Sequence, residues 1–433
     1  MHGVRRRTPV RKVLGVVVGG VLSLAAAFWI WVDSVADRRW AAVEKRVAAL
    51  AEEFAARDAR RPVLRADPLP GNAWDDYLLA IDALKTPGFK SVLEPFIERR
   101  PEAERDRVAA LVSGHAAALD HLQRGVRRAE SRSPFRLRHP ARIVHKDSPS
   151  LRSQDLILLA VCKARLLNEE GMQRDATRLL LDVCQLGHDI AWDADFVAAM
   201  VGMTAYSYAS RELRPWLVGR SLPGDALNDL NRELEMIDEQ FPEVGPLLTR
   251  EVASVGAALV NGDFIDSWQR ARVGFNNEPL PDSVFYTWRY AWSRRLMEAD
   301  AFQLSDSWMR RAAAAETQSS SAVNAVWDEI RKEADSLTKD SRNPVLELMG
   351  MHSFSPSGTF REPHARLRLL RVAVHYRATG EILDLEDPMG LKLVHSLDGG
   401  RLRVWSAGRD GANDGGEGQW PSGGKDIVLE IER

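Results

Sequence analysis

The longest hydrophobic stretch of the chain lies close to its start. Residues 13–32, VLGVVVGGVLSLAAAFWIWV, contain no charged side chain, whereas residues 1–12 carry five Lys and Arg residues. A helix of this length rises about 30 Å, which is roughly the thickness of the hydrocarbon core of a bilayer. The pattern predicts a basic cytoplasmic tail at 1–12 and a transmembrane anchor at 13–32.

A cleaved signal peptide is the alternative to an anchor. Its hydrophobic region is usually about 7 to 15 residues long and ends at small residues. Here the alanines at 25–27 lie inside the hydrophobic run and are followed by Trp29 and Trp31. Tryptophan favours the membrane interface, so we favour the anchor. The basic tail then places residues 33–433 outside the cytoplasm, in the periplasm if the cell has two membranes.

After the span, apolar residues recur at spacings of three and four. They predict an amphipathic helix over 33–62, continuous with the transmembrane helix, whose apolar seam consists of Ala36, Trp40, Val43, Val47, Leu50 and Phe54. Packing of this seam against the rest of the chain is the favoured interpretation. The alternative is a homo-oligomer in which residues 36–54 of two copies form a short coiled coil, although the seam covers fewer heptads than that prediction requires.

From residue 63 to residue 350 the patterns are almost entirely helical. Paired helices are predicted at 154–170 and 173–190, and again at 195–217 and 224–240. Such pairs resemble the stacked hairpins of an α-solenoid, although no strict repeat of about 34 residues is visible. The predicted fold class is mostly α, with a transmembrane helix, a solenoid-like helical ectodomain and a small C-terminal α+β module.

The C-terminal module, 361–433, has a different pattern. A helix is predicted to end near Gly380, and three short strands are predicted at 391–396, 401–407 and 426–432. The Asp-Gly-Gly step at the end of the first strand is a signal for a tight hairpin turn. We therefore expect a small antiparallel sheet.

Charge limits the possible partners. The chain has a net charge of −2, but removing the five basic residues of the tail from the 59 Lys and Arg leaves 54 against 61 Asp and Glu, or −7 outside the cytoplasm. A nucleic-acid partner requires a basic surface, so the composition argues against one. A protein partner in the cell envelope fits better.

The two cysteines lie in the two helices of the first predicted hairpin. If the chain turns near residue 172, Cys162 and Cys184 lie at nearly the same height, so a disulfide is geometrically allowed in an oxidising compartment. Two separate buried thiols on the core faces of these helices are an equally acceptable interpretation.

A stretch with five aromatic residues, VFYTWRYAWSRRL, occupies residues 284–296. Phe285, Trp288 and Trp292 share one face of the predicted helix. Aromatic residues at this spacing usually belong to a core. The alternative is a platform on which sugar rings stack, as a cell-envelope protein would use for a polysaccharide ligand.

The last 70 or so residues resemble a known family. A DPMG turn at 387–390, a strand ending in SAGRDG, a glycine-rich acidic loop and a closing KDIVLEI strand follow the C-terminal helix. This order resembles the C-terminal half of the major pseudopilin of bacterial type II secretion. The pseudopilin leader is absent, since no acidic residue precedes Asp33. The whole chain resembles uncharacterised envelope proteins that join a membrane anchor, a helical domain and this module.

The resemblance implies a calcium site, because the glycine-rich loop of that family binds Ca²⁺. The resemblance implies that the matching positions are Asp410 and Asp426; Asp414 is a further candidate in the same loop, without a fixed equivalent in the family. A glycine-rich loop with a few carboxylates also suits calcium on chemical grounds, since Ca²⁺ takes about six to eight oxygen ligands. A solvated loop without metal is the alternative.

No catalytic motif is present: the sequence has neither an HExxH nor a Gly-x-Ser-x-Gly arrangement. Asp189, Asp193 and Asp195 form an acidic corner that we interpret as a solvated helix end. The favoured function is therefore a membrane-anchored extracytoplasmic interaction or scaffold protein with a calcium-stabilised C-terminal module. The alternatives are a cell-wall or polysaccharide hydrolase and an accessory protein of a type II secretion-like system.

Overall fold

The structure is a computed structural model of the chain. It describes residues 10–55, 67–84, 89–99, 104–133, 149–192, 196–219, 222–261, 288–316, 318, 320–341, 356–390, 392–418, 420 and 425–432.

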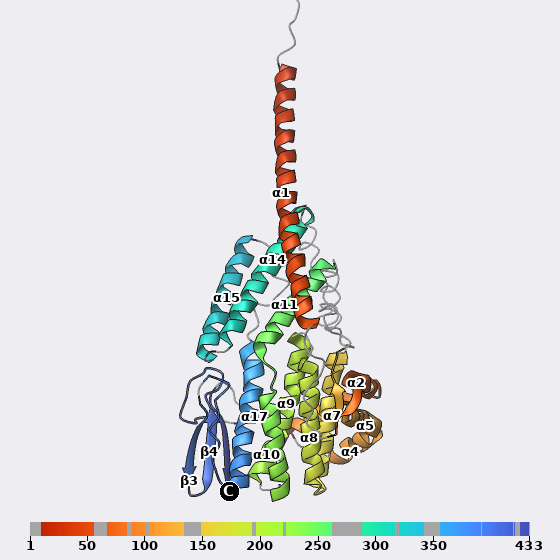
Figure 1. Cartoon of the computed structure of the whole chain (residues 1–433), viewed down its shortest axis with the longest axis vertical. Helices are drawn as coiled ribbons and strands as arrows, with labels where there is room; N and C mark the ends of the chain where they lie inside the picture. The colour runs from red at the N-terminus through yellow and green to blue at the C-terminus, as the bar shows by residue number, and fades with distance from the viewer. Residues whose placement is uncertain are drawn as a thin grey trace, which may run out of the picture.

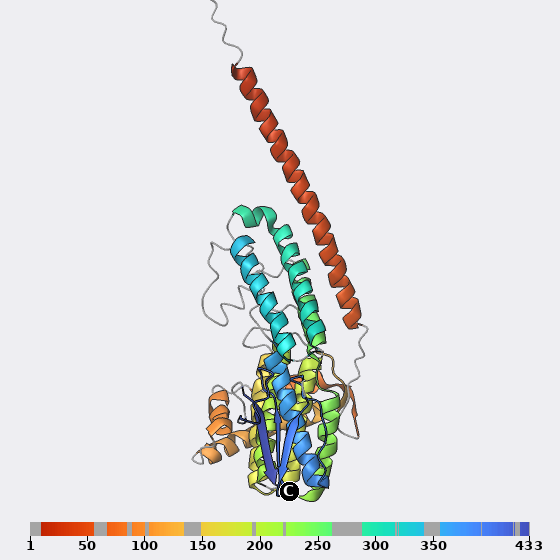
Figure 2. The same cartoon turned by 90° about the vertical axis from the view of Figure 1, so that its left-hand side faces the viewer.

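The chain starts with one long helix, α1 (Val10–Ala55), of 46 residues. At about 1.5 Å per residue it is roughly 69 Å long. Its first part extends well beyond the body of the molecule (Figures 1 and 2) and carries exposed apolar side chains, among them Leu24 (73% exposed) and Ile30 (68%). Its length and composition suit either a membrane anchor or a signal sequence. The predicted continuity between the hydrophobic stretch and the amphipathic helix is confirmed.

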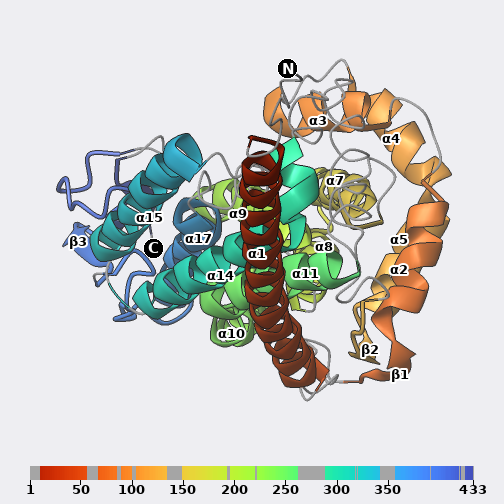
Figure 3. The same ribbon diagram turned by 90° about the horizontal axis from the view of Figure 1, so that it is seen from above.

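The second part of α1 packs against α11 (Val244–Val260) and α14 (Trp288–Ala315), and Figure 3 shows α1 crossing above them. Ala36, Val43 and Leu50, spaced by seven residues, are buried, and Trp40 and Val47 are partly buried against the same core. The side chain of Phe54 lies outside the described residues. The chain's own body thus covers the seam, which confirms the favoured packing against the rest of the chain. The coiled coil between two copies stays a prediction.

The centre of the body is built from the predicted helical hairpins. They are confirmed as α7 (Pro149–Glu169), α8 (Gln173–Trp192), α9 (Phe196–Val218) and α10 (Gly224–Glu239). The later helix α17 (Pro356–Thr379) packs against both α9 and α10. A solenoid repeat contacts only its neighbours, so this contact between distant segments makes the centre a bundle in which α17 is a full member.

Helices α8 and α9 approach each other closely at two glycines. A Cβ atom at Gly187 would lie 2.6 Å from the carbonyl oxygen of Gly202, and one at Gly202 would lie 2.5 Å from the carbonyl oxygen of Gly187. Both distances are far shorter than a real Cβ contact, so only glycine fits at this crossing.

Four shorter helices flank α7 on one side of the body (Figure 3). They are α2 (Ala73–Asp82), α3 (Phe89–Arg99), α4 (Arg105–Gly114) and α5 (Ala116–Gly125). The segments before α2 and after α5 form a parallel pair of short strands, β1 (Leu69–Asn72) and β2 (Arg128–Glu130), which the sequence analysis did not predict.

The opposite side carries a three-stranded antiparallel sheet in the order β3-β4-β5. Its strands, β3 (Val394–Asp398), β4 (Arg401–Ser406) and β5 (Ile427–Glu432), agree with the predicted ones. Gly399 and Gly400 both have positive φ, as the predicted tight hairpin requires. The sheet packs on α17.

The hydrophobic core is continuous. Buried residues from Val43 in α1 to Ile431 in β5 belong to one cluster, which also includes α14 and α15 (Ser320–Ser341). The core therefore crosses the predicted boundary between the helical ectodomain, 63–350, and the module at 361–433. Helix α17 begins at Pro356, before the predicted start of the module at 361, and contains Pro363. It ends, as predicted, before Gly380, whose φ is 84°.

Cys162 and Cys184 are both free and buried. The Cys162 sulfur is 3.9 Å from the carbonyl oxygen of Leu93, outside the α7–α8 pair. Burial raises the pKa of each thiol to about 12. The structure thus has two separate buried thiols and no disulfide between them.

Candidate functional sites in the body and the C-terminal loop

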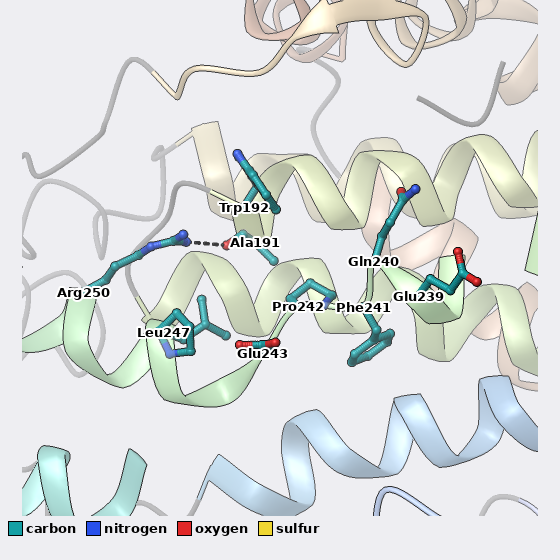
Figure 4. Close-up of a pocket in the computed structure, with 10 residues that line it drawn as sticks. Ala191, Trp192, Glu239, Gln240, Phe241, Pro242, Glu243, Leu247 and Arg250 are labelled. Atoms are coloured by element: carbon teal, nitrogen blue, oxygen red, sulfur yellow. Dashed lines mark hydrogen bonds between the residues drawn. The ribbon is translucent and has the colours of Figure 1, made fainter. Parts of the chain in front are cut away.

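A pocket of about 480 Å³ opens where the end of α8 meets the turn between α10 and α11 (Figure 4). Its walls are mainly apolar, with a few polar groups at the rim. The lining residues are Ala191, Trp192, Glu239, Gln240, Phe241, Pro242, Glu243, Pro246, Leu247 and Arg250.

The walls of this pocket are fixed by contacts behind them. The Arg250 Nη1 donates a hydrogen bond of 3.1 Å to the carbonyl oxygen of Ala191. Phe241 points towards α17 and stacks on His364, with ring centres 4.1 Å apart and planes at 4°. Its ring centre also lies 4.8 Å from that of Tyr206. The pocket is therefore preformed, as small-molecule sites usually are.

Behind Phe241, Asp238 of α10 binds three side chains of α17. His364 Nε2 is 2.6 Å from Asp238 Oδ1, Arg368 Nε donates at 2.8 Å, and Arg371 Nη1 donates to Oδ2 at 2.7 Å. Burial alone would raise the pKa of Asp238, but the hydrogen bonds and charges of His364 and Arg368 hold it well below its ordinary value. A carboxylate held in this way is a poor general base, so the cluster joins α10 to α17.

The structure does not agree with the interpretation of Asp189 as part of a solvated, acidic helix end. Asp189 is fully buried and accepts hydrogen bonds from the Tyr77 hydroxyl and, at 3.2 Å, from Gln185 Nε2. A solvated helix end is therefore wrong for Asp189, because its carboxylate is buried and bound by the Tyr77 hydroxyl of α2. Asp193 and Asp195 lie outside the described residues.

The proposed aromatic platform remains a prediction. Phe285 lies outside the described residues, and although Trp288 and Trp292 belong to α14, the placement of their side chains lies outside them too. Trp192 of α8 lines the pocket described above.

At the C-terminal module, Asp387 of the DPMG turn ties the turn to the end of β4. Its carboxylate accepts hydrogen bonds from Ser406 Oγ at 2.8 Å, Ala407 N at 2.9 Å and Met389 N at 3.0 Å. Burial raises the pKa of Asp387, although these three bonds act in the opposite direction. Sequence reasoning singled out the turn but not this role of its aspartate.

The three candidate calcium ligands lie in different environments. Asp410 and Asp414 are exposed, and Asp410 Oδ1 accepts a hydrogen bond of 3.0 Å from its neighbour Ala412 N. Asp426 is fully buried. Within the part of the chain that the structure describes, no group of three His, Cys, Asp or Glu side chains is placed to hold a metal ion. The predicted three-aspartate ligand set is therefore not assembled.

Of the three aspartates, Asp426 is the one whose carboxylate is buried. Its Oδ2 accepts a hydrogen bond of 2.7 Å from Gly416 N, whereas its buried Oδ1 has no hydrogen-bond partner among the described residues. The backbone at Gly408 and Lys425 comes close together, since a Cβ at Gly408 would lie 2.4 Å from the carbonyl oxygen of Lys425. An unpaired buried carboxylate oxygen is one kind of donor that Ca²⁺ uses.

The chain matches no protein-family model, no curated protein and no solved structure.

Proposed function

We propose that the protein is a single-pass membrane protein whose body lies outside the cytoplasm and serves as an interaction or scaffold protein of the cell envelope. The observation that carries this proposal is the continuity of α1. One helix bears exposed apolar side chains at its start and is packed on the body from Ala36 onward.

This geometry favours a retained anchor over a cleaved signal peptide. Cleavage after the alanines at 25–27 would leave the exposed apolar side chains of residues 28–31 at the start of the released chain, ahead of Ala36, where packing on the body begins. Ion pairs then hold the next turns: Asp37 to Arg295 at 3.3 Å, and Arg46 to Asp306 at 3.3 Å. The helix so fixed connects the body to the bilayer without a flexible linker.

The proposal includes a calcium ion at the C-terminal loop, bound by the Asp426 carboxylate and backbone carbonyls. When bound, the ion would neutralise the buried carboxylate and hold the loop against the start of β5. Asp410 and Asp414 are left out of this ligand set because both side chains are exposed.

Membrane retention and orientation test the proposal. The full chain should stay in the membrane pellet after extraction at alkaline pH, whereas a variant exported by an unrelated cleavable signal and lacking residues 1–32 should be released. Alkaline phosphatase fused after residue 433 should be active, because that enzyme folds only outside the reducing cytoplasm. Release of the full chain, or an inactive fusion, would contradict the proposal.

A further inference from the structure

Trp420, in the loop between β4 and β5, lies against two arginines from different helices. The guanidinium carbons of Arg214 in α9 and Arg366 in α17 are each 5.8 Å from the centre of its ring. The tryptophan is partly buried and packs against the hydrophobic core. The loop, α9 and α17 therefore meet at this cluster.

The cluster contains several buried hydrogen-bond donors that have no acceptor. Within the described part of the chain, Arg214 Nε, Arg366 Nε and Trp420 Nε1 are all buried without a hydrogen-bond partner. Buried polar groups in folded proteins are nearly always paired, and each exception requires an explanation. All three groups are donors, so the cluster lacks acceptors.

Positive charge also exceeds negative charge here. Glu362, itself buried, already pairs with both Arg366 and Arg409. The charge of Glu430 raises the pKa of Arg214, but Glu430 forms its ion pairs with Arg401 at 2.6 Å and with Arg403 at 3.1 Å.

Burial lowers the pKa of Arg214 and of Arg366. Glu430 opposes this effect at Arg214, and Glu362 opposes it at Arg366, where the charges of Arg409 and Arg211 lower the pKa further. An anion bound between the two arginines would raise the pKa of each.

We propose that Arg214, Arg366 and Trp420 form a binding site for an oxyanion, either a phosphate group or a carboxylate. Arg409, whose side chain is 59% exposed, marks the entrance. Guanidinium groups bind both kinds of anion through charge-assisted hydrogen bonds, and the indole N–H adds a third donor. Because the ligand would contact α9, α17 and the loop together, its binding would fix the loop on the body.

Calorimetric titration of the full chain in detergent at low ionic strength tests this site, with inorganic phosphate and acetate as separate probes. At least one should bind saturably, and Arg366→Gln should weaken binding about tenfold or more, since a hydrogen bond to a charged group is lost. Trp420→Phe should weaken it to a smaller extent, because the ring remains and the donor does not. If Arg366→Gln does not fold, Trp420→Phe decides alone.

Arg174→Gln is the matched control, since it removes one arginine that is 73% exposed on the far part of α8. It should leave binding unchanged. Preference for phosphate would identify a phosphorylated ligand, and equal or tighter binding of acetate would identify a carboxylate ligand. Absence of saturable binding by both probes, or equal weakening by Arg174→Gln, would overturn the proposal.

Discussion

Buried charged residues in this body are held by partners from other helices. Arg165 of α7 donates to Glu212 of α9 with Nε at 2.9 Å, and also to the carbonyl oxygen of Ile97 at 3.1 Å. Glu212 is fully buried. Removing one partner of such a pair leaves an uncompensated buried charge, which usually costs about 3 to 5 kcal/mol of stability. The sequence showed these residues but not their partners, which lie more than forty positions away.

His364 is the residue through which we expect pH to affect folding stability most clearly. Burial lowers its pKa despite the neighbouring Asp238, while Arg368 acts in the same direction as burial and Asp387 against it. The unfolded chain therefore takes up a proton near pH 6.5 before the folded protein does. Its contribution to stability is complete above that pH and is lost as the pH falls towards the folded-state pKa.

We expect His364→Gln to reduce the fall in melting temperature between about pH 7.5 and about pH 5.5, as measured by calorimetry. His395→Gln, an exposed histidine in β3, should keep the wild-type pH dependence. Equal slopes in wild type and His364→Gln would show that this histidine does not act as described.

Asp426 gives a prediction whose sign depends on calcium. In a chelator, Asp426→Asn should be at least as stable as wild type, since it removes the charge from an unpaired buried oxygen. With millimolar calcium, wild type and the exposed-site control Asp414→Asn should gain melting temperature and Asp426→Asn should not. A calcium response in Asp426→Asn equal to that of wild type would exclude this residue as a ligand.

At the scale of elements, the close crossing of α8 and α9 depends on glycine. Gly187→Ala places a Cβ 2.6 Å from a backbone oxygen, so we expect a loss of about 1 to 3 kcal/mol in the free energy of unfolding. Gly114→Ala in α4 meets no atom within 4 Å and should be neutral or slightly stabilising. Urea denaturation measures the free energy of unfolding of both variants. An equal change in the two would show that α8 and α9 can move apart without loss of stability.

Most helices and all three C-terminal strands could be predicted because their periodicity is local. Helix α8 differs from its predicted range by two residues at one end only. The pair β1–β2 could not be predicted, since it joins segments about sixty residues apart and its first strand reads Leu-Pro-Gly-Asn. The apolar seam of α1 could be predicted because it is also a local periodicity. The helices on which it packs, α11 and α14, could not be predicted.

At the scale of the whole molecule, sites are made by long-range packing that composition does not reveal. The glycine-rich loop suggested carboxylate ligands for a metal ion. Only the folded structure shows that Asp426 is buried and that Asp410 is exposed. The Trp420 cluster draws on α9, α17 and the loop, so no local pattern could predict it. The pocket at Phe241 similarly depends on α17 reaching α10 from more than a hundred residues away.

The docking of α1 on the body should contribute measurably to stability. Leu50 is fully buried there, so Leu50→Ala should lower the free energy of unfolding by about 2 to 5 kcal/mol. Leu79→Ala in α2, where the leucine is 52% exposed, is the control and should have a small effect. If the two variants lost equal stability, the packing of α1 on α11 and α14 would be in doubt.

The central claim is that α1 is kept whole and anchors the body in a membrane. Intact-mass spectrometry of the protein purified from the membrane fraction tests it most directly. We predict a mass that corresponds to residues 1–433 or 2–433, with the hydrophobic stretch retained. Recovery of a released chain that begins shortly after the alanines at 25–27 would contradict the anchor and make the start of α1 a signal peptide.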